Sequence, residues 1–152
     1  MKKITIPLLS LLLVLFFGCA NLAEEKLLKW SDNLESSVKL AKSESKYVLV
    51  NFTGSDWCVW CKKLNAEVFS QKEFAKYANE KLVLVKIDFP RSIEQTEATK
   101  KYNQDLAFKY GIQGFPTIVL LDKNGNLVAK TGYQPGGAAN YVTHLSQLFS
   151  QK

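Results

Sequence analysis

The chain has 152 residues, of which 47% are hydrophobic, 12% are aromatic and 22% are charged, and it contains three cysteines. This composition is that of one ordinary globular domain, and it excludes a disordered tail, a collagen-like fibre and a small domain held together by disulfides. Lysine and arginine outnumber aspartate and glutamate by 20 to 14, for a net charge of +6. The lysines are scattered among acids and Arg91 is the single arginine, a pattern that argues against nucleic-acid binding.

The first segment has the layout of an export signal. A short basic stretch over residues 1–3 precedes a mostly apolar run over residues 4–17. This run is shorter than the roughly 20 residues of a membrane-spanning helix, so it predicts a cleaved secretory signal. The residues that lead to Cys19 resemble a bacterial lipobox, which implies a signal peptide over residues 1–18 and a lipid on that cysteine. We therefore expect an exported, periplasmic lipoprotein that is anchored to the membrane.

The alternative for the leader is ordinary cleavage after Ala20, without lipid. With either outcome the exported protein keeps two free thiols, Cys58 and Cys61, and no odd thiol is exposed in an oxidising compartment. Residues 19–29 are then expected to form a short tether, and residues 30–152 the folded domain.

The domain is predicted to begin with an amphipathic helix and a buried strand. Apolar residues recur at spacings of three and four, which predicts a helix that ends near Ser45. Ser31 or Asp32 would cap this helix if it started late. An apolar run rich in β-forming residues follows over residues 47–52 and predicts a buried strand. The apolar positions of the helix are Leu27, Trp30, Leu34, Val38 and Ala41.

A second helix is predicted to begin near Cys58, because residues 54–56 interrupt the strand and helical spacing then resumes. Ser70 marks a break in this helix or the cap of another. A second buried strand is expected over residues 82–89, since Pro90 cannot continue a central ladder. The inward-facing positions of the helical segment are Leu64, Val68, Phe74 and Tyr77.

In the last part of the chain the sequence pattern predicts a polar helix over residues 94–110, a strand over 117–121, a hairpin and a final helix. The sequence Asn124-Gly125 is a strong hairpin signal, so residues 127–131 should return antiparallel. Together the elements predict an α/β fold in which a mixed central sheet has helices on both faces. The buried positions of the two helices are expected to be Leu106, Phe108 and Tyr110, and then Tyr141, Val142, Leu145, Leu148 and Phe149.

The residues that carry chemistry are two cysteines separated by two residues, Cys58 and Cys61, between a buried strand and a helix. This spacing places them one helical turn apart, where a disulfide is feasible. Free N–H groups at the start of the helix stabilise a thiolate, which is the nucleophile in disulfide exchange. Cys58 is therefore expected to be exposed and to attack a substrate. Cys61, one turn inside the helix, is expected to be shielded and to resolve the mixed disulfide.

Two motifs about 55 residues apart resemble the thioredoxin superfamily, in particular exported bacterial thioredoxin-like proteins. One is Trp57 with the two cysteines that follow it, and the other is a Gly-Phe-Pro-Thr segment that contains Phe115 and Pro116. The resemblance covers residues 45–149 and implies a thioredoxin fold. It also implies a cis peptide bond at Pro116 beside the active-site sulfurs, a Phe115 backbone that pairs with substrate, and Trp57 at the border of the site.

The sequence departs from the thioredoxin pattern at two places. Thioredoxins usually carry a buried aspartate on the strand before the cysteines, thought to help proton transfer, whereas Asn51 stands here and cannot titrate. Deprotonation of Cys61 would then need water, Lys62 or Lys63, or the substrate. The Val-Trp pair between the cysteines replaces the Gly-Pro pair of thioredoxin, and such residues tune the redox potential.

Other roles for the cysteine pair fit the sequence less well. A zinc site needs two further ligands, and the sequence offers only Cys19 in the leader and His144, so no metal is expected. A purely structural disulfide would close a very short loop and add little stability. Nearby, Asp56 would either cap the second helix or raise the pKa of the thiol, and Trp60 would face either solvent or a partner.

The sequence as a whole predicts an exported thiol-disulfide oxidoreductase that acts on protein disulfides, more readily as a reductase. No cofactor is implied beyond the disulfide of Cys58 and Cys61, and the chain is expected to be a monomer that receives electrons from a membrane partner. The alternatives are an oxidase that introduces disulfides, a reductase with a dedicated client such as apocytochrome thiols, and a non-catalytic binding module.

Overall fold

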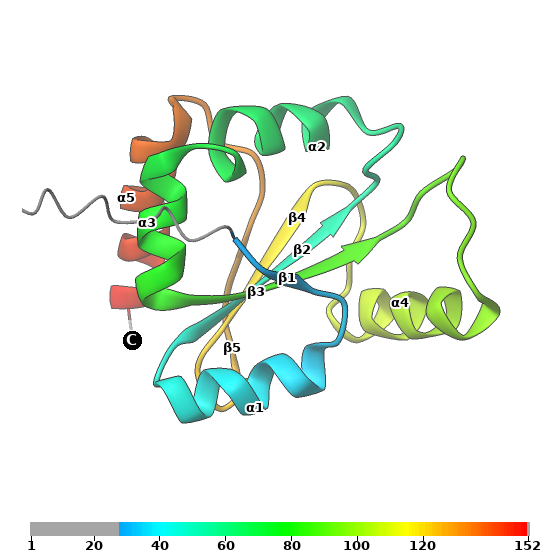
Figure 1. Ribbon diagram of the computed structural model, residues 1–152, viewed down its shortest axis with the longest axis horizontal. Helices are drawn as coiled ribbons and strands as arrows, with labels where there is room; N and C mark the ends of the chain where they lie inside the picture. The colour runs from blue at the N-terminus through cyan, green and yellow to red at the C-terminus, as the bar shows by residue number, and fades with distance from the viewer. Residues whose placement is uncertain (1–27, 152) are drawn as a thin grey trace, which may run out of the picture.

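The computed structural model describes residues 28–151 (Figure 1). The expected signal peptide, its lipidated Cys19 and residues 19–27 of the expected tether lie outside the described residues. Between residues 28 and 151, no helix is both long enough and apolar enough to cross a membrane.

A five-stranded mixed sheet forms the centre of the domain, with the strand order β1-β3-β2-β4-β5. The first three strands in this order are parallel, β4 runs antiparallel to β2, and β5 returns antiparallel to β4. The mixed sheet predicted from the sequence is confirmed. The strands are β1 (Trp30–Ser31), β2 (Tyr47–Thr53), β3 (Leu82–Asp88), β4 (Thr117–Leu121) and β5 (Leu127–Thr131).

Helices cover both faces of this sheet, as the sequence predicts (Figure 1). Because side chains alternate along a strand, Leu49 of β2 packs with the residues of α3 and α5, whereas Val48 and Val50 pack with those of α1 and α4. The side chains of Leu49 on one face and of Val48 and Val50 on the other are fully buried. The helical segments are α1 (Leu34–Glu44), α2 (Val59–Leu64), the π-helix η1 (Asn65–Phe69), α3 (Lys72–Lys81), α4 (Glu97–Lys109) and α5 (Gly137–Ser150).

The beginning of the domain differs from the expected helix. Trp30 lies in β1, where it pairs with Leu84, and its ring packs 5.2 Å from that of Phe69. The helix starts only after Asn33, whose side chain accepts a hydrogen bond from the N–H of Ser36 at 2.8 Å. The expected caps Ser31 and Asp32 are therefore wrong. Trp30 lies four residues before Leu34, so its spacing suggests one more turn at the start of α1. Its strand pairing with β3 and its contact with Phe69 place it in β1 instead.

The helix α4 corrects a second expectation, because Phe108 is 91% exposed. Leu106 and Tyr110 are buried as predicted, together with Asn103. These three positions are three or four residues apart and share one face of the helix. Phe108 follows Leu106 by two residues, a rotation of about 200° at 3.6 residues per turn, so its side chain points to the opposite face.

The remaining apolar positions of the helices follow the sequence pattern closely. Leu64, Val68 and Phe74 are fully buried, whereas Tyr77 is only partly buried and packs against the same cluster. The predicted hairpin is confirmed between β4 and β5. Gly125 in its turn has φ of 85°, a left-handed conformation that favours glycine.

Candidate redox site

A disulfide joins Cys58 and Cys61 at the start of α2, with their Cα atoms 5.2 Å apart. Cys58 is the N-cap residue of this helix, and its sulfur accepts a hydrogen bond from the N–H of Cys61 at 3.1 Å. A donated N–H stabilises negative charge on the acceptor, so the helix start favours a thiolate at Cys58 rather than at Cys61.

The expected difference in exposure between the two cysteines is wrong for the oxidised protein. Cys58 and Cys61 are each only 6% exposed. Since the two sulfurs are bonded to each other, each covers part of the other. The asymmetry between the cysteines therefore rests on their positions in the helix and on the hydrogen bond, not on exposure.

The loop before Cys58 fixes the position of the disulfide. The N–H of Cys58 donates to the carbonyl of Gly54 at 2.8 Å and closes a tight turn at the end of β2. The ring of Trp57 lies directly on Gly54, where an added Cβ would meet its Cε2 at 2.5 Å. Glycine at this position is what allows the indole to lie against the backbone.

Trp57, which follows β2, contacts both the loop after β3 and the segment before β4. Its Nε1–H donates to the carbonyl of Phe89 at 2.8 Å. Its ring meets the edge of Phe115 with centroids 5.9 Å apart, and the guanidinium of Arg91 lies 4.0 Å above the same ring. Trp57 and Phe115 are therefore in contact beside the cysteine loop.

The Phe115–Pro116 peptide bond is cis, as the resemblance implied. Both residues are partly buried and directly precede β4. Because Thr117 at the start of β4 pairs with Phe52 near the end of β2, this segment lies at the same end of the sheet as the cysteine loop. The structure therefore brings the two motifs of the sequence together.

Asp56 does not cap α2, whose N-cap residue is Cys58. Its carboxylate accepts hydrogen bonds from the backbone N–H groups of Ser92, at 2.6 Å, and Arg91, at 3.0 Å. The N–H of Ser92 is the main cause that lowers the pKa of Asp56 below its ordinary value, with a smaller lowering from Arg91 and from the charge of Lys62. Asp56 holds the loop after β3 and so keeps Arg91 above Trp57.

An apolar surface lies on the outer side of α2. Val59 is 74% exposed and Trp60 is 54% exposed. The Trp60 ring packs 5.3 Å from that of Tyr133, and the ammonium of Lys63 lies over both rings. Tyr133 follows β5 and no local sequence pattern marks it. Arg91 could have been found, because it follows β3 at the edge where the carboxyl ends of parallel strands meet.

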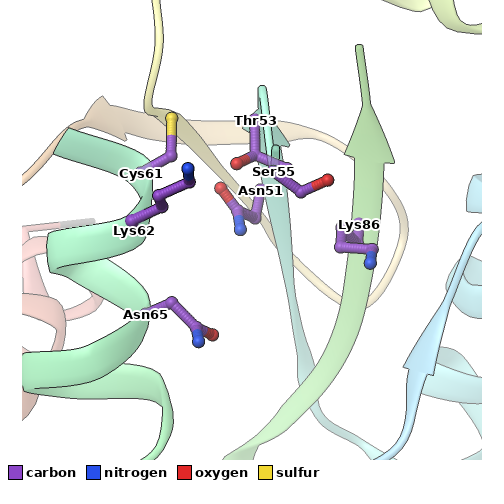
Figure 2. Close-up of a pocket in the computed structure, with 7 residues that line it drawn as sticks. All are labelled: Asn51, Thr53, Ser55, Cys61, Lys62, Asn65 and Lys86. Carbon is purple, nitrogen blue, oxygen red and sulfur yellow. The ribbon is translucent and has the colours of Figure 1, made fainter. Parts of the chain in front are cut away.

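A polar cavity of about 250 Å³ lies on the inner side of α2, behind Cys61 (Figure 2). Asn51 is only 8% exposed, and its Oδ1 accepts no hydrogen bond from the described residues. Asparagine thus occupies the buried position anticipated from the sequence. The residues that line the cavity are Asn51, Thr53, Ser55, Cys61, Lys62, Asn65 and Lys86.

Within residues 28–151, no group of three or more histidine, cysteine, aspartate or glutamate side chains is placed to hold a metal ion. The imidazole Nε2 of His144 instead lies 2.8 Å from the hydroxyl of Thr131.

Comparison with known proteins supports this interpretation of the site. Residues 34–145 match the family model described as a thioredoxin-like domain. The chain is 37% identical over 116 residues to disulfide bond reductase DsbH of Chlamydia pneumoniae, covering 76% of this chain and 69% of that protein. It is 30% identical to thiol:disulfide interchange protein DsbD of Colwellia psychrerythraea, over 93% of this chain but 25% of the relative. A solved DsbH oxidoreductase superposes with a TM-score of 0.77 at 33% identity, covering 84% and 88% of the two chains.

Proposed function

The chain belongs to the thioredoxin-like family and is a thiol-disulfide oxidoreductase, and from this premise we propose that it reduces protein disulfides outside the cytoplasm. The observation that carries the proposal is the disulfide of Cys58 and Cys61 at the start of α2. The similarity to a disulfide bond reductase supports the direction of the reaction. The redox-active disulfide is the only cofactor that this chemistry requires.

In the proposed reaction the Cys58 thiolate attacks one sulfur of a substrate disulfide. The substrate S–S bond breaks, a mixed disulfide with Cys58 forms, and the first substrate sulfur leaves as a thiolate. The Cys61 thiolate then attacks the Cys58 sulfur and releases the second substrate sulfur. Two electrons have passed to the substrate, and the protein is left with the disulfide seen in the structure. The N–H of Cys61, which points at the Cys58 sulfur, favours the first attack.

The substrate chain is proposed to dock at the rim formed by Trp57, Phe115 and Pro116. Their place at the end of the sheet that carries the disulfide supports this role. The exposed Val59 and Trp60, beside Cys58 in the sequence, add apolar surface that suits an unfolded or loosely folded protein segment.

The proposed compartment and electron supply follow from the leader and from the relatives. Signal-peptide cleavage after residue 18 and a lipid on Cys19 would hold the domain over residues 30–152 at a membrane as a monomer. A membrane protein would then return electrons to the disulfide of Cys58 and Cys61, and the similarity to part of DsbD is consistent with such an exchange. Cys19→Ala should release the protein from the membrane fraction. Membrane fractionation that finds the unaltered chain soluble would contradict the anchor.

The test of the mechanism is the asymmetry between the two cysteines. Cys61→Ser should accumulate mixed disulfides between Cys58 and exported proteins, which appear on a non-reducing gel and disappear with dithiothreitol. Cys58→Ser is the matched control and should accumulate few or none, and it should not reduce insulin. Equal trapping by both variants would contradict the assignment of the nucleophile. A wild-type protein that reduces nothing would favour the non-catalytic binding module.

The direction of transfer is tested by the reduction potential of the Cys58–Cys61 couple. A reductase should lie near the value of thioredoxin, about −270 mV, and a strong oxidase near about −120 mV. Equilibration with glutathione or with a reference thioredoxin measures it. A potential at the oxidising end would overturn the proposed direction while leaving the exchange chemistry intact.

A further inference from the structure

The cavity behind Cys61 is formed by side chains that the sheet register brings together. Asn51 of β2 pairs with Lys86 of β3, so both side chains lie on the face of the sheet that α2 covers. From α2, Cys61 and Lys62 close the opposite wall. Figure 2 shows the amine of Lys62 directed toward Asn51 and lying near Cys61, while Lys86 stands on the neighbouring strand.

The unpartnered oxygen of Asn51 points to an occupant of this cavity. Buried polar atoms in proteins are almost always hydrogen-bonded, to protein groups or to ordered water. Asn51 is more than nine-tenths buried, and its Oδ1 has no partner among the described residues. The cavity of about 250 Å³ is polar. Since one water molecule takes about 30 Å³ in the liquid, several water molecules fit beside Asn51 and Cys61.

The charged side chains that line the cavity are positive. Lys62 on α2 and Lys86 on β3 line it, and no carboxylate does so among the described residues. Two acids belong to the elements around the cavity without lining it, and both accept hydrogen bonds. Asp88 on β3 accepts hydrogen bonds from the backbone N–H of Ser55 at 2.9 Å and from its hydroxyl at 2.5 Å. Asp56, in the loop before α2, accepts from the backbone of residues 91–92. The charged side chains that line the cavity are therefore both cations.

We propose that this cavity is a cation-lined water site through which Cys61 loses its proton when it resolves the mixed disulfide. The inference rests on the proposed function and assigns positioning roles to Asn51, Lys62 and Lys86. Water held by Asn51 accepts the proton of the Cys61 thiol and passes it to solvent. The two ammonium groups stabilise the thiolate that remains, and this thiolate bonds to the Cys58 sulfur. The bond from Cys58 to the substrate breaks, and the substrate sulfur leaves as a thiolate that solvent protonates.

The two half-reactions can be followed separately with dithiobis-nitrobenzoate and the reduced full-length protein carrying Cys19→Ala, in which Cys58 and Cys61 are the only cysteines. Attack by Cys58 releases one coloured nitrothiobenzoate and leaves the other attached to Cys58. Attack by Cys61 releases the second and forms the internal disulfide. Stopped-flow absorbance with substoichiometric reagent gives both rates, and their ratio from about pH 6 to about pH 9 is the readout.

Lys62→Gln should lower the ratio of the second rate to the first roughly threefold to tenfold at neutral pH. This corresponds to a move of the rising limb of the second phase by about half to one pH unit toward higher pH. Lys86→Gln should act in the same direction with a smaller effect. Lys76→Gln, the same change of charge at an exposed position of α3 outside the cavity, should leave the ratio unchanged.

Asn51→Leu removes the acceptor that holds the water, so it should slow the second phase at every pH without slowing the first. If the two cavity lysine variants behave like Lys76→Gln, or if Asn51→Leu leaves the second phase unchanged, the cavity has no part in proton transfer. Failure of the proposed function gives a different result. In that case the parent protein shows no intramolecular second phase, and the two thiols react independently.

Discussion

The two sides of the Cys58–Cys61 disulfide are built in opposite ways. On one side Trp57 makes three contacts, a hydrogen bond to the carbonyl of Phe89, a T-shaped contact with Phe115 and a cation–π contact with Arg91. On the other side Asn51 is buried with its Oδ1 unpartnered among the described residues. The aromatic side contributes to stability through the same groups that are proposed to bind substrate. The polar side gives up stability in order to hold charge and water beside a thiol.

The largest expected effect is the loss of Trp57. Trp57→Ala removes a hydrogen bond, two ring contacts and the surface that covers Gly54, so the free energy of unfolding should fall by about 3 kcal/mol. Urea denaturation of the oxidised protein measures this change. Trp60→Ala, at a ring that is half exposed, should change stability by no more than about 0.5 kcal/mol. Equal losses of stability for Trp57→Ala and Trp60→Ala would mean that the contacts of Trp57 stabilise the protein no more than those of Trp60.

The dependence of Trp57 on Gly54 gives the next effect. In Gly54→Ala the new Cβ would lie 2.5 to 2.7 Å from three atoms of the indole, one of them the Nε1 that donates to Phe89, so the indole must shift. We expect a loss of about 1–3 kcal/mol and a change in tryptophan fluorescence. Gly114→Ala is the matched control, since a Cβ added at Gly114 would meet nothing within 4 Å. Normal stability of Gly54→Ala would show that the indole can shift without cost.

On the polar side, substitution of Asn51 should raise the free energy of unfolding rather than lower it. Asn51→Leu replaces a buried acceptor that has no partner among the described residues, and it also releases the water proposed to be ordered there. The free energy of unfolding should therefore rise by about 1 kcal/mol. Asn103 is also buried, at 4% exposure, but its Nδ2 donates to the carbonyl of Asp88 at 2.8 Å. Asn103→Leu should therefore destabilise the protein by about 1–3 kcal/mol. Thermal unfolding that shows both variants destabilised alike would mean that Asn51 is as well satisfied as Asn103.

The smallest expected effect is the pH dependence that Asp56 contributes. Its pKa is lowered in the folded protein, mainly by the N–H of Ser92, from an ordinary value of 3.8. Its stabilising contribution is therefore fully present above 3.8 and disappears as the pH falls through the lowered pKa. Asp56→Asn should be less stable than the parent near neutral pH, and the two should converge in acid. Asp105→Asn, at an exposed acid of α4, is the control for the change in charge. Parallel curves for Asp56→Asn and the parent would contradict this role.

The parts of the fold that follow a repeating pattern could be predicted from the sequence. The buried strands, the hairpin at Gly125 and the cysteine pair at a helix start are each fixed by neighbours in the chain. The buried face of a helix is predictable only where its apolar residues keep the helical spacing of three and four. The sequence places Phe108 on the wrong face of α4, because two apolar residues two positions apart cannot both follow a period of 3.6.

The contacts of the site that could not be predicted join segments distant in the sequence. Trp57 meets Phe89 and Arg91 across more than 30 residues, and Trp60 meets Tyr133 across more than 70. Such contacts depend on how loops leave the sheet, which no local pattern encodes. The position of Asn51 was predictable from the cysteine motif. Its neighbour Lys86 becomes predictable only once the register of β2 and β3 is known.

The very short β1 has a consequence for how molecules of this protein meet one another. It covers β3 only at Leu84 and Val85, so the last residues of β3 form an open edge of the sheet on that side, within the described chain. Open edges invite pairing with a strand from another molecule, and proteins commonly block them with charged residues, lysine above all. Lys86 and Asp88 occupy this stretch. Substituting Lys86 by an apolar residue would therefore bring, besides any effect on the cysteines, a risk of aggregation through this edge.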